Sequence, residues 1–249
     1  GEKESSLKSS YDDEFTKLAH ERGVGDAADA IARRIRDDRD RRATRDRSVD
    51  DTGTVGPVRG DTVQLGAARR TGRKSEARVR YRDGRGTGSN DRGEHLTAED
   101  FSAVGQANKA AHKFGTSVDV YPAEEYEGYE LILLEKDGET ATISISPQGE
   151  VGSVTKSAGA DRKIVMDAFE VAIETGKVKW LNGFDTILPK IYSALGFKAV
   201  ARLKFDPEYS PEGWDYEAYE RFNKGKPDVV FMSYVGQPSR YVEGEGAYV

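Results

Sequence analysis

The side chains with the clearest capacity for chemistry form a basic run between positions 69 and 85. The run holds Arg69, Arg70, Arg73, Lys74, Arg78, Arg80, Arg82 and Arg85, with Tyr81 as its only aromatic residue. Clustered cations beside an aromatic ring are typical of an arm that contacts RNA or DNA, because the cations neutralise phosphates while the ring stacks on a base. A single tyrosine is a poor stacking platform, however, and the alternative interpretation is a solvated spacer.

Other kinds of site are excluded by residue type and spacing. His20, His95 and His112 are scattered and show no metal-ligand spacing, so the sequence predicts no metal site. The chain contains no cysteine, which removes disulfide and thiolate chemistry. It also lacks a G-x-S-x-G elbow and a phosphate-binding P-loop. No apolar run approaches the roughly 20 residues of a membrane span.

Charge and hydropathy divide the chain into four regions. Residues 1–47 predict a charged helical region, and residues 48–95 a basic linker rich in Gly and Arg. Residues 96–235 predict a folded domain, and residues 236–249 a polar tail. The formal net charge is -6, but the segment around the linker is net basic and the rest is acidic. Since residues 1–47 cannot form a core, we expect other protein chains to order them.

The folded domain is organised around residues 161–197, which predict a helix, a short strand and a second helix. Apolar residues at helical spacing mark the first helix, which Gly176 ends. The strand is expected at Val178 to Leu181. The second helix is expected from Thr186 to Leu195, with Asp185 or Thr186 as its cap and Pro189 in its first turn.

The remaining elements predict a sheet. A helix is expected from Leu96 to Phe114, with Thr97 as its cap. Strands are expected at residues 117–121, 129–136, 140–146, 150–155, 198–205 and 228–235, with a hairpin turn at Asp137-Gly138. This order predicts an α/β (α+β) fold, in which helices flank a mixed and mostly antiparallel sheet.

At this point the chain resembles the GNAT acetyltransferase superfamily. The residues that carry the resemblance are the segment IYSALGF at 191–197 and Phe231-Met232 in the last strand. The stretch from Phe184 to Glu217, followed by PDVVFM, is similar to the GNAT-like domains of phage-encoded virion and polyvalent proteins. The resemblance covers roughly residues 96–235 and implies a GNAT-like sheet.

The resemblance also implies a place for acetyl-CoA, since the family holds the pyrophosphate with a glycine-rich turn that leads into a helix N-terminus. The matching segment here is Lys156, Ser157, Ala158, Gly159 and Ala160. It is followed by Asp161, where phosphate would lie, and the alternative is a turn that only caps a helix.

The resemblance gives two residues a candidate catalytic role. Tyr192 matches the tyrosine that protonates the departing thiolate in many of these enzymes, and the alternative is a core aromatic. Asp185 is either a general base or a helix cap. Arg202 could pair with Asp185 or Asp228, or reach a ligand.

Two functions follow as expectations. The first is a virion-associated or structural protein of a phage, whose GNAT-like domain is used for assembly or partner docking, without catalysis. Its partners would be other virion or scaffold chains, with nucleic acid as a possible contact of the basic linker, and its location the virion or the host cytoplasm. The alternative is an acetyl-CoA-dependent N-acetyltransferase that acts on an unknown amine. No cofactor is implied by the first function, and acetyl-CoA is implied by the second.

Overall fold

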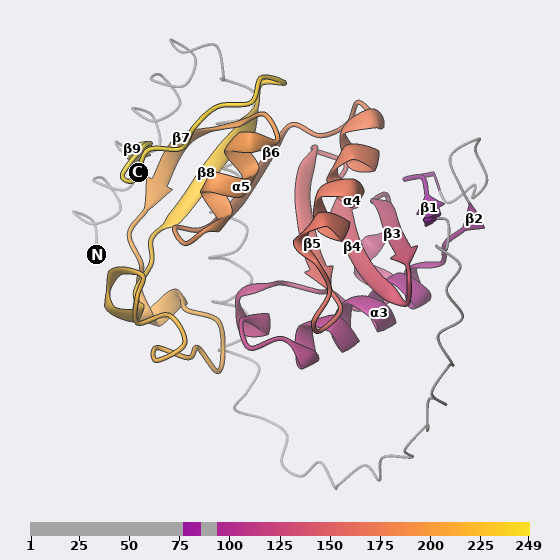
Figure 1. The fold of residues 1–249 in the computed structure, drawn as a ribbon, viewed down its shortest axis with the longest axis horizontal. Helices are drawn as coiled ribbons and strands as arrows, with labels where there is room; N and C mark the ends of the chain where they lie inside the picture. The colour runs from indigo at the N-terminus through magenta and orange to yellow at the C-terminus, as the bar shows by residue number, and fades with distance from the viewer. Residues whose placement is uncertain (1–76, 86–93) are drawn as a thin grey trace, which may run out of the picture.

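The computed structural model describes residues 77–85 and 94–249, so the predicted helical region 1–47 and most of the predicted linker lie outside the described residues. The strands are β1 (Arg78–Arg82), β2 (Glu94–His95), β3 (Glu130–Lys136), β4 (Glu139–Ile145), β5 (Glu150–Lys156), β6 (Trp180–Phe184), β7 (Phe197–Leu203), β8 (Val229–Tyr234) and β9 (Ala247–Tyr248). They form one mixed, mostly antiparallel sheet in the order β2-β1-β3-β4-β5-β6-β8-β7-β9 (Figure 1). The predicted α+β class is confirmed.

Three helices of the described chain cover the two faces of this sheet. Helices α4 (Arg162–Glu174) and α5 (Leu188–Ala194) pack on one face, and α3 (Ala98–Ala111) packs on the other (Figure 1). The larger core lies under α4 and includes Ala168 and Phe169 of this helix together with Ile132 and Ile143 of the sheet. A smaller core around Phe101 lies under α3.

Local sequence signals explain most of these elements. Thr97 accepts a hydrogen bond from the backbone N–H of Asp100 and so caps α3. Both residues of the turn between β3 and β4 have positive φ, 52° at Asp137 and 83° at Gly138, as a two-residue hairpin requires. Gly176 follows α4 with φ 70°, a conformation that favours glycine.

One predicted strand is wrong. Ser117 is the last residue of a short 3₁₀ turn, Gly115–Ser117, and residues 118–121 continue as a loop. Side chains already donate hydrogen bonds to the backbone carbonyl groups with which a neighbouring strand would pair. Gln106 donates to the carbonyl of Val120 at 2.7 Å, and Ser102 donates to the carbonyl of Tyr121 at 2.7 Å. The alternation of this segment therefore reflects packing against α3 and no sheet pairing.

The sheet extends beyond the predicted domain 96–235 at its N-terminal side. Residues 78–82, which the sequence assigns to the linker 48–95, form β1 and pair with β3. Two of its arginines form ion pairs with neighbouring elements, Arg80 with Asp100 at 2.5 Å and Arg78 with Glu135 at 3.7 Å. These basic side chains are therefore held by the domain itself.

The sheet also extends into the predicted polar tail 236–249. Residues Ala247–Tyr248 form β9, which pairs in parallel with β7. Tyr241 is 5% exposed and belongs to the main core. The tail therefore covers an edge strand, as an exposed edge often requires.

Candidate functional site

The candidate site begins where two neighbouring strands part. β5 and β6 run parallel and pair only at Glu150–Trp180 and Val151–Leu181. Beyond these pairs each strand continues separately, to Lys156 and to Phe184, and Figure 1 shows the two halves of the sheet on either side. A cavity of about 980 Å³ opens between them, lined by residues of both strands. Its size lies in the range of ligand sites.

A β-bulge interrupts the pairing of β5 with β4 and changes the direction of β5 beside the cavity. Thr142 of β4 pairs with Thr155, and Ser144 pairs with Gly152, so two residues of β5 oppose a single residue of β4. Ser153 adopts φ 48° at the bulge. Its hydroxyl donates to the carbonyl of Asp119 at 2.9 Å and contacts the Tyr126 hydroxyl at 2.8 Å. Such bulges increase strand twist, which is consistent with the separation of β5 from β6.

The cavity has a part on each face of the sheet. The part beneath the two helices, which we name the α4–α5 chamber, is mainly apolar. Its lining comprises Val154, Ala160, Val165, Leu188, Ile191 and Tyr192. Gly183 of β6 also faces this chamber, because a Cβ atom there would meet Tyr192 at 3.4 Å and Leu188 at 3.6 Å. A narrow apolar chain fits such a lining.

Tyr192 reaches the cavity with a hydroxyl that is not used elsewhere. The residue is 6% exposed, its ring contacts Phe169 and Phe197, and it lines the α4–α5 chamber. Within the described part of the chain its hydroxyl makes no hydrogen bond. Burial raises the pKa of Tyr192 well above its ordinary value, so the phenol stays protonated. The predicted position of Tyr192, beside the opening between β5 and β6, is confirmed.

The segment matched to the phosphate-binding turn is largely satisfied by its own domain. The N–H of Ser157 donates to Thr140, and the N–H of Ala160 donates to Ser157. The Lys156 ammonium donates to the carbonyl of Ala160 at 2.7 Å. Of the five predicted cofactor residues, Lys156 and Ala160 line the cavity, whereas Ser157, Ala158 and Gly159 form the turn beside it.

Asp161 confirms the capping interpretation of this turn. Its carboxylate accepts a hydrogen bond from the N–H of Lys163 at 2.7 Å, and its own N–H donates to Glu139. An anion at this helix terminus would have to displace the aspartate. Arg162 is exposed and lines the cavity, and it offers a positive charge at the same end.

Asp185 lies outside the cavity lining, and its predicted role as the cap of α5 is wrong. Its carboxylate accepts from Arg202 at 2.5 Å and from the Tyr241 hydroxyl at 3.0 Å. The residue that caps α5 is Ile187, without a side-chain hydrogen bond. The predicted pairing of Arg202 is confirmed, since Arg202 also contacts Asp228 at 3.3 Å. Sequence reasoning therefore predicted this ion pair correctly, and the general-base role of Asp185 stays a prediction.

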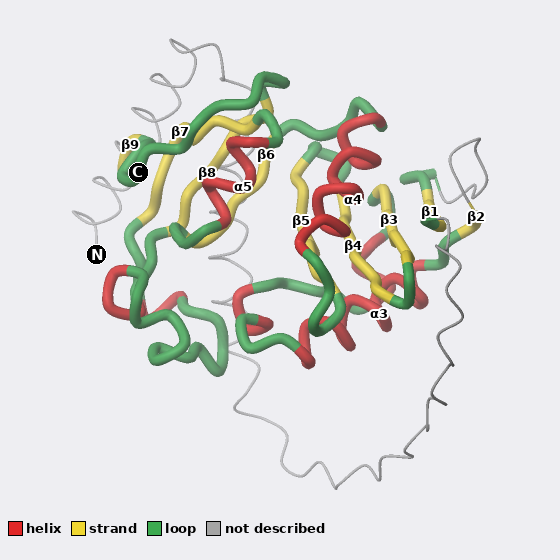
Figure 2. The backbone as a smooth tube through the Cα atoms, viewed as in Figure 1, coloured by secondary structure: helices red, strands yellow, loops and turns green. Residues whose placement is uncertain are grey.

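The part of the cavity on the opposite face, which we name the α3 chamber, combines polar and aromatic residues. Ser144, Glu150, Gly152 and Asn182 form its floor, on the strands. Its wall includes Phe114, Phe184, Tyr219 and Phe222, and its rim includes the exposed Asp119, Lys204, Asp206 and Arg221. Figure 2 shows that the loop between β7 and β8 lies beside the loop after α3, and the rings of Phe114 and Tyr219 meet at 5.0 Å.

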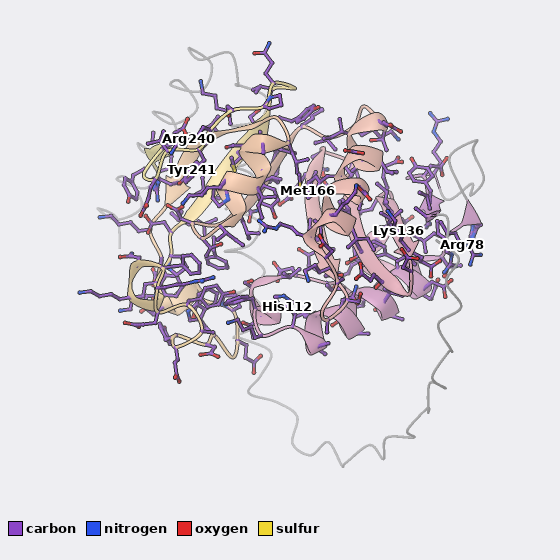
Figure 3. All side chains as sticks on the ribbon, in the orientation of Figure 1. Arg78, His112, Lys136, Met166, Arg240 and Tyr241 are labelled. Carbon is purple, nitrogen blue, oxygen red and sulfur yellow. The ribbon has the colours of Figure 1, made fainter. Side chains whose placement is uncertain are left out.

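His112 contributes a hydrogen-bond donor to this chamber. It lies at the end of α3 that faces the other half of the sheet (Figure 3). Burial lowers the pKa of His112, and the positive charges of Lys156 and Lys113 lower it further, so the ring is neutral at pH 7. Its Nδ1 accepts from the N–H of Phe114 at 3.2 Å, which leaves the proton on Nε2.

Sequence reasoning missed the residues of the α3 chamber. The alternation in β4 did assign Thr142, Ser144 and Ser146 to one face, and a run of buried hydroxyl residues is the signal that could have indicated a polar chamber there. Among the described residues, no group of three or more acidic or histidine side chains could hold a metal ion. No helix in the described ranges is long and apolar enough to span a membrane. Comparisons of the chain with family models, curated proteins and solved structures find no match.

Proposed function

We propose that this chain transfers an acyl group from a thioester in the α4–α5 chamber to an acceptor in the α3 chamber. The observation that carries the proposal is the Tyr192 hydroxyl, which is protonated, lacks a partner and lines a cavity between two splayed strands. A structural aromatic residue has no need of such an opening. The resemblance to GNAT acetyltransferases supports acetyl-CoA as the thioester, because it predicted this tyrosine from the sequence.

The cavity suits a direct transfer. The acceptor nitrogen attacks the thioester carbonyl carbon, the carbon–sulfur bond breaks, and the sulfur takes the phenolic proton of Tyr192 as it leaves. The proton lost from the nitrogen returns to the phenolate, so the products are an amide and a free thiol. Because the chain has no cysteine, an acyl-cysteine intermediate cannot form.

The α4–α5 chamber fits one part of acetyl-CoA better than the other. The apolar lining of the α4–α5 chamber fits the arm that carries the sulfur, and Gly183 leaves room for it beside Tyr192. At the phosphate end, the amide groups of the turn are largely occupied, and Asp161 caps the helix. Arg162 adds a positive charge at this end to that of Lys156, whose ammonium already donates to the carbonyl of Ala160.

Release of free thiol tests the proposal. The full chain is mixed with acetyl-CoA and a panel of amines, and a thiol-reactive dye reports the product. Since the protein has no cysteine, its own background is zero. Thiol release that depends on both the amine and the protein is expected. A rate equal to the protein-free rate across the panel would overturn the proposal.

The occupied turn favours a second candidate, a module used for assembly. In this candidate the GNAT-like domain is non-catalytic and belongs to a phage virion or scaffold protein, located in the virion or the host cytoplasm. The observation that favours this candidate is the position of Asp161. Its carboxylate accepts from the N–H of Lys163, where the resemblance to GNAT enzymes would place a phosphate. The candidate predicts no thermal shift with acetyl-CoA at millimolar concentration. It also predicts that other chains order residues 1–76, which amide exchange on the isolated chain would report as weak protection.

A further inference from the structure

The α3 chamber carries an inference about the acceptor, and it rests on the proposed transfer. Its wall is a preformed aromatic cluster. Trp214 stacks on Tyr219 at 4.2 Å and 13°, and its indole N–H donates to the carbonyl of Gly225 at 3.0 Å. Phe184 meets Trp214 at 4.6 Å, and Phe222 meets Tyr219 at 6.5 Å. A wall fixed in this way can receive an aromatic ring at little cost in conformational entropy.

The floor of the same chamber presents a hydroxyl group to the cavity. Ser144 is 1% exposed and lines the cavity, and in the described ranges its hydroxyl makes no hydrogen bond. A hydroxyl that protein groups leave unpaired at a cavity surface can exchange its water for a ligand atom. Opposite it in the sheet is Gly152, where a Cβ atom would approach Ser144 Oγ at 3.5 Å. The glycine keeps the space beside the hydroxyl open.

A carboxylate lies on the same floor. Glu150 is two residues from Gly152 on the same face of β5, and one of its oxygens accepts from Asn182 at 3.1 Å. A carboxylate that lines a cavity attracts a positive charge to it. The exposed rim carries both signs of charge, whereas the ionisable group of the floor is the acid. The floor therefore favours a cation.

We propose that the α3 chamber binds a small primary amine that carries an aromatic ring. Its ammonium donates to the Ser144 hydroxyl and to the Glu150 carboxylate, and its ring packs against Phe184, Tyr219 and Phe222. Before transfer the Glu150 carboxylate takes one proton from the ammonium and later releases it to solvent, so the nitrogen that attacks the thioester is the neutral amine. The contact between Phe114 and Tyr219 joins the two loops that enclose the chamber, which suits a small molecule better than a protein surface.

Calorimetric titration of the full chain tests this assignment, with phenethylamine as the probe. Butylamine is the control that lacks the ring, and phenylacetate is the control with the opposite charge. Phenethylamine is expected to bind about tenfold or more tightly than either, because only it uses both the wall and the floor. Equal affinity for phenethylamine and either control would overturn the proposal.

Variants of the floor make the test specific. Glu150→Gln and Ser144→Ala are each expected to weaken phenethylamine binding by about tenfold, the usual scale of a hydrogen bond to a charged group. Glu212→Gln, a change at an exposed glutamate outside the cavity lining, is the matched control and should alter the affinity less than about twofold. Unchanged binding in Glu150→Gln would overturn the role of the carboxylate.

A parallel titration with acetyl-CoA separates this inference from the proposed function. Binding of acetyl-CoA without binding of phenethylamine would overturn only the acceptor assignment. Binding of phenethylamine without binding of acetyl-CoA would support the α3 chamber and would contradict the proposed transfer.

Discussion

Gly183 on β6 and Tyr192 on α5 lie so close that a Cβ atom added at Gly183 would meet Cε2 of Tyr192 at 3.4 Å. The same atom would meet a Leu188 side-chain carbon at 3.6 Å. The absence of a side chain at position 183 therefore keeps the α4–α5 chamber open beside the tyrosine. Gly183 does not have positive φ, so the backbone does not require glycine, and a side chain larger than one carbon would fill the space beside Tyr192.

Gly183→Val is expected to close this chamber. The added methyl groups occupy the space beside Tyr192, while a β-branched residue is compatible with a strand. Affinity for acetyl-CoA, measured by calorimetry, should fall by about tenfold or more, the scale of 1.4 kcal/mol. Gly183→Ala, which adds one carbon at ordinary contact distance, is the control and should have a smaller effect. Wild-type affinity in Gly183→Val would show that the thioester does not lie there.

Tyr192→Phe separates a general acid from a core residue. Because the hydroxyl has no hydrogen bond in the described ranges, its removal should change the free energy of unfolding by less than about 0.5 kcal/mol. The rate of transfer should fall by about 10²-fold. Denaturant unfolding and the thiol-release assay measure the two quantities. A loss of stability of about 1 kcal/mol with an unchanged rate would instead indicate a structural role.

The ion pairs of Arg202 with Asp185 and Asp228 should contribute to stability and should not affect the rate of transfer. The Arg202 side chain is 4% exposed and lies between Asp185 and Asp228. Its removal leaves two largely buried carboxylates without their cation. Arg202→Ala should cost about 3–5 kcal/mol of unfolding free energy. Arg240→Ala, at an exposed arginine of the segment 236–249 (Figure 3), is the matched control and should change the free energy of unfolding by less than about 0.5 kcal/mol.

Asp185→Asn completes this test. It should lower stability, but the transfer rate of the folded protein should stay within about threefold of wild type, because Asp185 is absent from the cavity lining. A rate loss as large as that of Tyr192→Phe would restore Asp185 as a general base.

The sequence predicted the elements whose signals are local. The Asp137-Gly138 turn, the Thr97 cap and the Gly176 helix end each depend on one or two residues, and all three are confirmed. It failed where distant side chains decide the backbone. Residues 117–121 alternate like a strand, yet Gln106 and Ser102 bind their carbonyl groups from α3. Residues 78–82 look like a charged linker, yet ion pairs such as Arg80 with Asp100 hold them in the sheet.

The candidate site was predictable only where one residue carried a recognisable pattern. Tyr192 was found through the motif at 191–197. Ser144, Gly152, Glu150 and Asn182 were not found, because they come from three strands and meet only after the sheet forms. The spacing of these residues along the sequence therefore gives no sign that they lie close together in the fold. The capping role predicted for Asp185 is wrong, because its carboxylate pairs with Arg202, which lies on another strand.

Alkaline pH should destabilise the fold through its tyrosines. Burial raises the pKa of Tyr192, and burial together with Asp185 raises the pKa of Tyr241 to about 12. Between about pH 10 and 12 these phenols ionise in the unfolded chain before they ionise in the folded one, so stability is full below pH 10 and is lost as pH rises. Denaturant unfolding from pH 8 to 11 should show this decline, with a smaller slope in Tyr192→Phe. An identical slope in the variant would contradict the burial of Tyr192.

Binding of acetyl-CoA to the full wild-type chain tests the central claim most directly. Calorimetry should give one saturable site, and the melting temperature should rise with ligand concentration, as it does for any ligand that selects the folded state. Phenethylamine should not compete with acetyl-CoA, because the two occupy different chambers. The account predicts binding at or below about millimolar concentration. Absence of both heat and thermal shift at millimolar acetyl-CoA would contradict the account and would favour a domain used only for assembly.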